Sequence, residues 1–158
     1  MPPSVIIDGL VVEAANWDED KAALIKLRGI VFVEEQNVPV ELEIDGMDPD
    51  CRHVKAFMGD QTIGTARLLP SGYIGRMCVL KSFRNQGVGS KMLTNLIQQA
   101  FFDKTISPLL NEITLNAQSS AIAFYERNGF VVCSEEFMDA NIIHRKMVLK
   151  RTDNQSKN

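Results

Sequence analysis

The sequence predicts a mixed α/β fold, with α and β elements intermixed (α+β), in a single domain built on a mixed sheet of about six to seven strands. The chain has 158 residues with 45% hydrophobic content, enough for one domain that buries its own core. Short apolar runs typical of strands alternate with longer segments of helical apolar spacing. Residues 73–116 have the order strand, helix, strand, which indicates a crossover between parallel neighbouring strands. We expect the domain to span residues 1–150, with a polar, frayed tail at 151–158.

The first half of the chain is expected to contain a strand at 6–13 and a helix from about Asp18 to Val33. Asn16 marks the helix start, because it offers a side-chain acceptor and the acid Glu19 follows three residues later. Residues 34–50 predict a long loop, since they contain two prolines and a glycine. Seven acids and no Lys or Arg lie in this loop: Glu34, Glu35, Glu41, Glu43, Asp45, Asp48 and Asp50.

The second half begins with three strands, at 53–58, 62–69 and 73–80. Tight turns that contain Gly59 and Gly72 join them, which predicts an antiparallel meander. The elements expected after the meander are a helix to about Lys104, a strand at 112–116, a helix at 119–128, and strands at 130–133 and 142–149.

The stretch Lys81–Ser90 joins the last meander strand to an amphipathic helix. Gly87 and Gly89 let the backbone approach a ligand without interference from a Cβ atom. A helix start also presents unpaired N–H groups and the positive end of its dipole, so the place suits a phosphate group. The alternative is a plain glycine turn that opens a helix.

Other phosphate-binding motifs fit this stretch poorly. A Walker loop is excluded, because Arg84 stands where its first glycine should be. A dinucleotide-binding fingerprint would need a third glycine where Met92 stands and an acid at the end of the strand 113–116. Neither is present, so a nicotinamide-dependent enzyme is only a weak alternative. Between Gln61 and Phe102 there is no acid, and five basic residues would create a positive field: Arg67, Arg76, Lys81, Arg84 and Lys91.

Composition restricts the class of partner. The net charge of −3 and pI of about 5.4 argue against a nucleic-acid partner. The chain shows no signal sequence and no apolar run of membrane-spanning length, so we expect a cytoplasmic protein with no membrane partner. Cys51, Cys78 and Cys133 have no CxxC spacing, which predicts no metal site and reduced thiols, with Cys78 and Cys133 buried.

At this point the chain resembles the GNAT superfamily, the Gcn5-related N-acetyltransferases, from its first strand to about Leu149. The run Arg84–Gly89 matches the pattern Arg/Gln-x-x-Gly-x-Gly/Ala, with which that family wraps the pyrophosphate of coenzyme A. Asn116 and the run Ala121–Phe130 are similar to the family's asparagine and its FYE..GF signature. Residues 31–36, the acids of the long loop and His144 resemble the ElaA/YjcF-type branch.

The resemblance implies the GNAT fold, with about four helices around a central twisted sheet, and acetyl-CoA as co-substrate. A backbone N–H near Val79 would polarise the thioester carbonyl. The residues implied to bind the cofactor are Met77, Cys78, Val79, Arg84, Asn85, Gln86, Gly87, Val88, Gly89, Ser90, Asn116, Phe124 and Tyr125.

Tyr125 is the expected general acid, because a phenol can protonate a departing thiolate. Its spacing on an amphipathic helix also fits a core tyrosine. Asn116 could hydrogen-bond the pantetheine amide or a water, or be a turn former. Cys78 could act as a nucleophile, although packing is the commoner role of a strand cysteine. The candidate bases are Glu34, Glu35, Asp45, His53, Glu136 and His144, of which Glu35 is favoured.

The predicted function is transfer of an acetyl group from acetyl-CoA to a primary amine of a small molecule or peptide, by direct attack in a ternary complex. The alternative is a sensor or interaction module that binds acyl-CoA without turnover. If residues 34–50 border the acceptor pocket, their acids would favour a cationic amine. The alternative is that residues 34–50 form a solvated surface loop. Separately, the family resemblance implies a possible homodimer.

Overall fold

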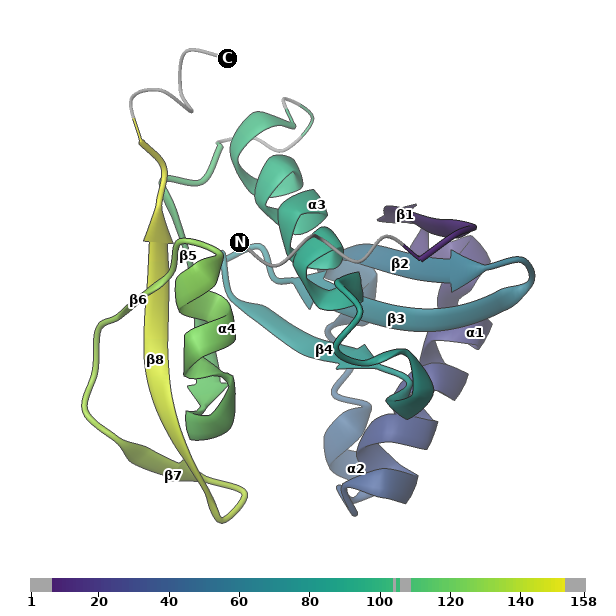
Figure 1. Ribbon diagram of the computed structural model, residues 1–158, viewed down its shortest axis with the longest axis horizontal. Helices are drawn as coiled ribbons and strands as arrows, with labels where there is room; N and C mark the ends of the chain where they lie inside the picture. Colours follow the sequence, from purple (N-terminus) through teal and green to yellow (C-terminus); the bar gives the residue numbers. More distant parts are fainter. Residues whose placement is uncertain (1–6, 104, 106–108, 153–158) are drawn as a thin grey trace.

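The computed structural model describes residues 7–103, 105 and 109–152. Within them, eight strands form two four-stranded sheets (Figure 1). The helical elements are α1 (Trp17–Arg28), a π-helix (Gly29–Glu35), α2 (Val40–Glu43), α3 (Val88–Phe102), α4 (Ile122–Arg127) and 3₁₀ turns at Asp48–Asp50, Lys81–Phe83 and Ser119–Ala121. The strands are β1 (Leu10–Ala15), β2 (Arg52–Met58), β3 (Gln61–Leu68), β4 (Ile74–Val79), β5 (Glu112–Gln118), β6 (Val131–Val132), β7 (Phe137–Asp139) and β8 (Ile142–Lys150). The mixed α/β class is confirmed, whereas Ile6, Lys104 and most of the expected tail lie outside the described residues.

The two sheets meet at one point. The first has the order β1-β2-β3-β4, and the second has β5-β8-β6 with β7 also paired to β8. A single parallel bridge joins Tyr73 to Thr114, where the Thr114 N–H donates to the Gly72 carbonyl at 2.9 Å. Beyond this bridge β4 and β5 diverge (Figure 1). The predicted crossover connection is therefore present. However, the two strands pair only at this bridge, so the expected single sheet is divided into two.

Helix α3 supplies a large part of the core. Its buried face, which includes Met92, Leu93 and Leu96, packs against β2, β3 and β4. Gly64 on β3 permits this approach, because a Cβ there would lie 2.9 Å from the Met92 sulfur. Helix α1 also packs against β3, with Leu24 fully buried. The first sheet is thus fixed in place just before the chain enters the glycine loop.

The helix predicted from Asp18 to Val33 is divided in two. The Glu19 N–H donates to Asn16 Oδ1 at 3.2 Å, and the Asn16 N–H donates to a carboxylate oxygen of Asp20 at 2.9 Å, which completes the N-terminal cap. After Arg28 the chain continues as a π-helix, a rare conformation that is frequent at functional sites. The expected loop 34–50 contains the short helix α2.

Strand β4 contains a bulge. Arg67 pairs with Gly75 and Thr65 pairs with Cys78, so Ala66 of β3 faces two residues of β4. Regular alternation would place Ile74 and Cys78 on the same face. Instead, Ile74 belongs to the core beside α3, whereas Cys78 packs against Leu27 of α1. The bulge therefore reverses the two faces of the strand along its length.

Two expectations for the C-terminal part were wrong. The sequence did not predict strand β7, Phe137–Asp139, which is recognised only through its pairing with β8 in the folded structure. Cys133 is exposed instead of buried, while the buried position expected for Cys78 is confirmed.

Candidate active site

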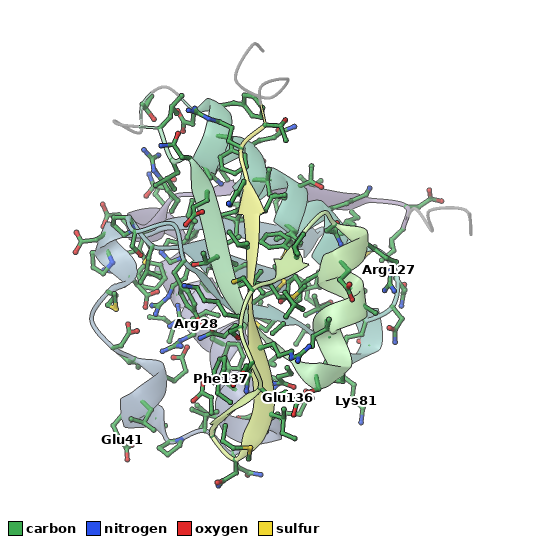
Figure 2. The ribbon with its side chains drawn as sticks, turned by 90° about the vertical axis from the view of Figure 1, so that its left-hand side faces the viewer. Arg28, Glu41, Lys81, Arg127, Glu136 and Phe137 are labelled. Carbon is green, nitrogen blue, oxygen red and sulfur yellow. The ribbon has the colours of Figure 1, made fainter. Side chains whose placement is uncertain are left out.

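A groove of about 670 Å³ opens where β4, the glycine loop and α4 come together. Most of the predicted cofactor residues line it: Met77, Cys78, Val79, Arg84, Asn85, Gln86, Gly87, Val88, Gly89, Ser90, Phe124 and Tyr125. Asn116 and Glu35 are not among the lining residues. Sequence reasoning missed Val31, Gln36, Phe83 and Arg127, although three of these lie in runs that resemble family motifs. Arg127 projects from α4 at the same side of the molecule as Lys81 (Figure 2).

The glycine loop leads directly into α3, as its sequence suggested. Gly87 precedes α3 with φ 85° and ψ 0°, a left-handed conformation that L side chains rarely adopt. A Cβ at Gly89 would lie 3.2 Å from the Phe124 ring, so a small residue is needed where α3 passes α4. The first N–H groups of α3 have no partner within the helix. They are available for an anionic ligand.

Arg84 binds two segments beside the groove. Its Nε donates to the Val79 carbonyl at 2.9 Å, and its two terminal nitrogens each donate to a carboxylate oxygen of Glu35 at 2.8 Å. The hydrogen bond from Arg84 lowers the pKa of Glu35 below its usual value. Glu35 is therefore a weaker base than an ordinary glutamate, and Arg84 joins the end of the π-helix to the end of β4.

Tyr125 points from α4 toward β4. Its hydroxyl donates to the Met77 sulfur at 3.6 Å, and its ring makes edge contacts with Phe124 and Phe130. Burial raises the pKa of Tyr125 to about 12, with a smaller contribution from the Tyr73 phenol. The phenol is therefore protonated at neutral pH and lies against a strand that lines the groove.

Asn116 lies on β5 and is half-buried. Burial raises the pKa of Tyr73, and the nearby side chain of Asn116 partly offsets this rise. This contact lies beside the bridge between Tyr73 and Thr114, where the two sheets meet. Asn116 is thus placed at the junction of the sheets and outside the groove.

The Cys78 thiol is poorly suited to nucleophilic chemistry. Cys78 is 5% exposed, and its burial raises the pKa of the thiol to about 12. Since the thiolate is the nucleophile, burial and the raised pKa favour a packing role for this cysteine. Within residues 7–103, 105 and 109–152, no group of three His, Cys, Asp or Glu residues could hold a metal ion.

Besides Glu35, three acids of the long loop form ion pairs, and two of them, Glu43 and Asp48, are buried, which corrects the alternative of a solvated loop for these two. Glu43, Asp45 and Asp48 form ion pairs with three arginines of the rest of the fold: Arg28, Arg67 and Arg76. Asp48 Oδ1 lies 2.7 Å from a terminal nitrogen of Arg28 and 3.0 Å from one of Arg67, and all three side chains are buried. Figure 2 shows Arg28 inside the fold and Glu41 at the edge of the molecule.

The positive field expected around the glycine loop is consequently smaller than the sequence suggested. Arg67, Arg76 and Arg84 each form an ion pair with an acid from residues 34–50. Lys81 and Lys91 are the members of the basic set for which the structure records no ion pair among the described residues. Attraction of an anion to the groove therefore depends on backbone N–H groups, on these lysines beside the groove and on Arg127 in its lining, for which the described residues also record no ion pair.

Two of the candidate bases have structural partners. The His53 Nε2 lies 2.9 Å from the Asp48 carbonyl, its ring stacks on Trp17, and its burial lowers its pKa. The His144 Nδ1 lies 2.7 Å from the Ile142 carbonyl, and its ring stacks on Phe137. Neither histidine lines the groove. Glu136 is exposed on the segment before β7 (Figure 2).

The fold and groove define an acyl-CoA-dependent acyltransferase, and comparison with known proteins identifies the family. The sequence model of the acetyltransferase (GNAT) domain matches residues 24–151. The chain belongs to this family and to its ElaA/YjcF-like branch. It is similar to the Bacillus subtilis protein "Uncharacterized N-acetyltransferase YjcF", with 39% identity over 87% of this chain and 96% of that protein.

Solved structures show the same relationship. Escherichia coli ElaA superposes with a TM-score of 0.76 at 27% identity, covering 89% of this chain and 99% of that chain. An acyl-CoA N-acyltransferase from Pseudomonas aeruginosa superposes with a TM-score of 0.74 at 30% identity and the same coverage. No helix among the described residues is long and apolar enough to cross a membrane.

Proposed function

We propose that the protein transfers an acetyl group from acetyl-CoA to a primary amine of a small molecule or peptide, by direct attack in a ternary complex. The observation that carries this proposal is the groove of about 670 Å³. It brings β4 and the glycine loop that follows it together with Tyr125, which comes from a distant part of the chain.

The pyrophosphate and the pantetheine arm of coenzyme A would lie along different parts of the groove. The pyrophosphate would lie against the backbone N–H groups of residues 86–90, with Lys81 and Lys91 nearby. The pantetheine arm would extend along Met77–Val79, because β4 has no partner strand on this side after β5 diverges. In this arrangement a backbone N–H near Val79 would polarise the thioester carbonyl.

Tyr125 would act on the departing sulfur. The amine nitrogen attacks the carbonyl carbon, a C–N bond forms, the C–S bond breaks and the thiolate takes the proton of the phenol. The proton lost by the amine goes to a base or to water, and the tyrosinate recovers a proton from solvent. The buried Cys78 thiol makes an acyl-enzyme the poorer route.

Two other predicted residues receive different roles. We assign Glu35 to the positioning of Arg84, because both of its carboxylate oxygens accept hydrogen bonds from that guanidinium. Asn116 would support the junction of the two sheets through its contact with Tyr73. The acids of residues 34–50 give weaker support to a cationic acceptor than the sequence suggested, because four of them, Glu35, Glu43, Asp45 and Asp48, are paired with arginines.

Calorimetric titration with acetyl-CoA, coenzyme A and NADH tests the cofactor, and thiol release against a panel of amines tests the reaction. Binding of the coenzyme A species alone, with amine-dependent thiol release, is expected. Binding without thiol release for any amine would favour the sensor module. Absence of coenzyme A binding would contradict the proposal.

A further inference from the structure

Arg76 has an unusual backbone conformation for a residue inside a strand. Its φ is 51°, and it is the one non-glycine residue with positive φ within a strand of the described chain. Such a conformation is rare for residues with a side chain, and glycine adopts it readily. It coincides with the bulge at which Ala66 faces two residues of β4. The backbone at this point therefore needs a source of stabilisation from outside the strand.

The guanidinium of Arg76 provides contacts of this kind. It donates to the Leu42 carbonyl at 3.1 Å, to the Glu43 carbonyl at 3.1 Å and to Asp45 Oδ2 at 3.3 Å. Its Nε also lies 3.6 Å from the buried Glu43 carboxylate. All of these acceptors come from α2 and the residues directly after it. Arg76 thus fastens the bulge of β4 to α2.

The bulge decides which face of β4 each side chain occupies. Met77 within the bulge and Val79 after it pack against the core that contains α3, while Cys78 between them packs with Leu27 and Val31. If the extra residue were lost from β4, the register would slip by one and each of these side chains would turn to the opposite face. Cys78 would then leave its buried position.

We propose that Arg76 is a positioning residue, which holds the bulge of β4 through α2 and so keeps Met77–Val79 in the register that presents the strand to the thioester. This inference rests on the proposed function of the groove. It also assigns a purpose to the paired acids of the long loop, since Glu43 and Asp45 join Arg76 to the buried Arg28 and Arg67. The segment on one side of β4 would thereby control the strand on which acyl transfer takes place.

The variants Arg76→Ala and Arg76→Gly separate this role from a general effect on folding. Both remove the guanidinium, but only glycine adopts positive φ without strain. We expect kcat to be roughly tenfold lower in Arg76→Ala than in Arg76→Gly, because the free-energy cost of a left-handed conformation for a non-glycine residue corresponds to about that factor. Equal losses in the two variants, or no loss in either, would overturn the proposal.

Alkylation of Cys78 provides a readout that does not depend on activity. Iodoacetamide labelling, located by peptide mass spectrometry, should be slow at Cys78 in the wild-type protein and faster in Arg76→Ala, with Arg76→Gly close to wild type. Exposed Cys133 serves as the internal control, and its labelling should be equal in all three. A wild-type protein that does not bind coenzyme A would refute the proposed function, whereas equal labelling of Cys78 in all three would refute the role of Arg76.

Discussion

The Tyr125 hydroxyl lies 3.6 Å from the Met77 sulfur, although 48 residues separate them in the chain. Tyr125 belongs to α4, which packs against the second sheet, and Met77 belongs to the edge of the first sheet. Their contact joins α4 to β4, the strand that diverges from β5 after the bridge at Tyr73 (Figure 1). The candidate proton donor is therefore aimed at the strand that would hold the thioester.

Replacement of Tyr125 by Phe should lower kcat by about 10²-fold, the lower part of the range for loss of a general acid. Coenzyme A affinity should change little, because the ring and its contacts with Phe124 and Phe130 remain. Steady-state kinetics and calorimetry measure the two effects. The matched control is Tyr73→Phe, since Tyr73 is the other tyrosine of the chain and does not line the groove. Equal turnover in Tyr125→Phe and the wild-type protein would remove Tyr125 as the acid.

A charge at Gly87 should prevent coenzyme A binding. Gly87→Asp would place a carboxylate against the expected pyrophosphate and also strain a backbone with φ 85°. Gly87→Asn has the same shape without the charge and tolerates left-handed φ better, so its affinity should be intermediate. Gly59→Asp is the control, because Gly59 also has positive φ, with open space around it, and lies in a turn away from the groove. Unchanged affinity in a folded Gly87→Asp variant would place the cofactor elsewhere.

The paired acids of the long loop should make stability depend on pH. Burial alone would raise the pKa of Asp48, but hydrogen bonds from Arg28 and Arg67 outweigh this effect and lower it. The carboxyl of Asp48 therefore has a lower pKa in the folded protein than in the unfolded chain, where the value is about 3.9. It stabilises the fold at pH values above about 3.9, and this stabilisation is lost as the pH falls through the folded pKa. The free energy of unfolding of the wild-type protein should therefore fall below about pH 5.

Asp48→Asn tests the same contacts at neutral pH. It should lower the free energy of unfolding by about 3 kcal/mol, because the buried charges of Arg28 and Arg67 lose one of the carboxylates that neutralise them. Urea unfolding at several pH values measures the effect, and the loss in acid should be shallower than in the wild-type protein. Asp60→Asn, in an exposed turn, should behave like the wild type. A flat pH dependence in the wild-type protein would show that the ion pairs contribute little.

Glu35→Gln distinguishes a base from a partner of Arg84. The variant keeps the size of the side chain but weakens its hydrogen bonds with the guanidinium. We expect kcat to change by less than tenfold, whereas loss of a general base costs about 10² to 10⁴. The KM for acetyl-CoA should change instead, because Arg84 lines the groove. A hundredfold loss of kcat with unchanged coenzyme A binding would restore Glu35 as the base.

Some features could be predicted because they depend on short stretches of chain. The glycine loop needs glycine at a left-handed position before a helix, and Gly87 and the start of α3 are where the local pattern placed them. The cap of α1 at Asn16 and the meander strands follow from equally local rules. Strand β7 could not be predicted in this way, because three residues carry little periodic signal without their partner β8.

The sequence by itself determined the mixed α/β class, the GNAT family, the glycine loop and most of the residues that line the groove, because each depends on local backbone preferences or on a motif of adjacent residues. Only the tertiary structure decided that the sheet divides after Tyr73, that the acids near α2 pair with Arg28, Arg67 and Arg76, and that Glu35 binds Arg84. The physical reason is that charges and strand edges have many possible partners along the chain. Burial and packing, which exist only in the folded molecule, select one partner for each.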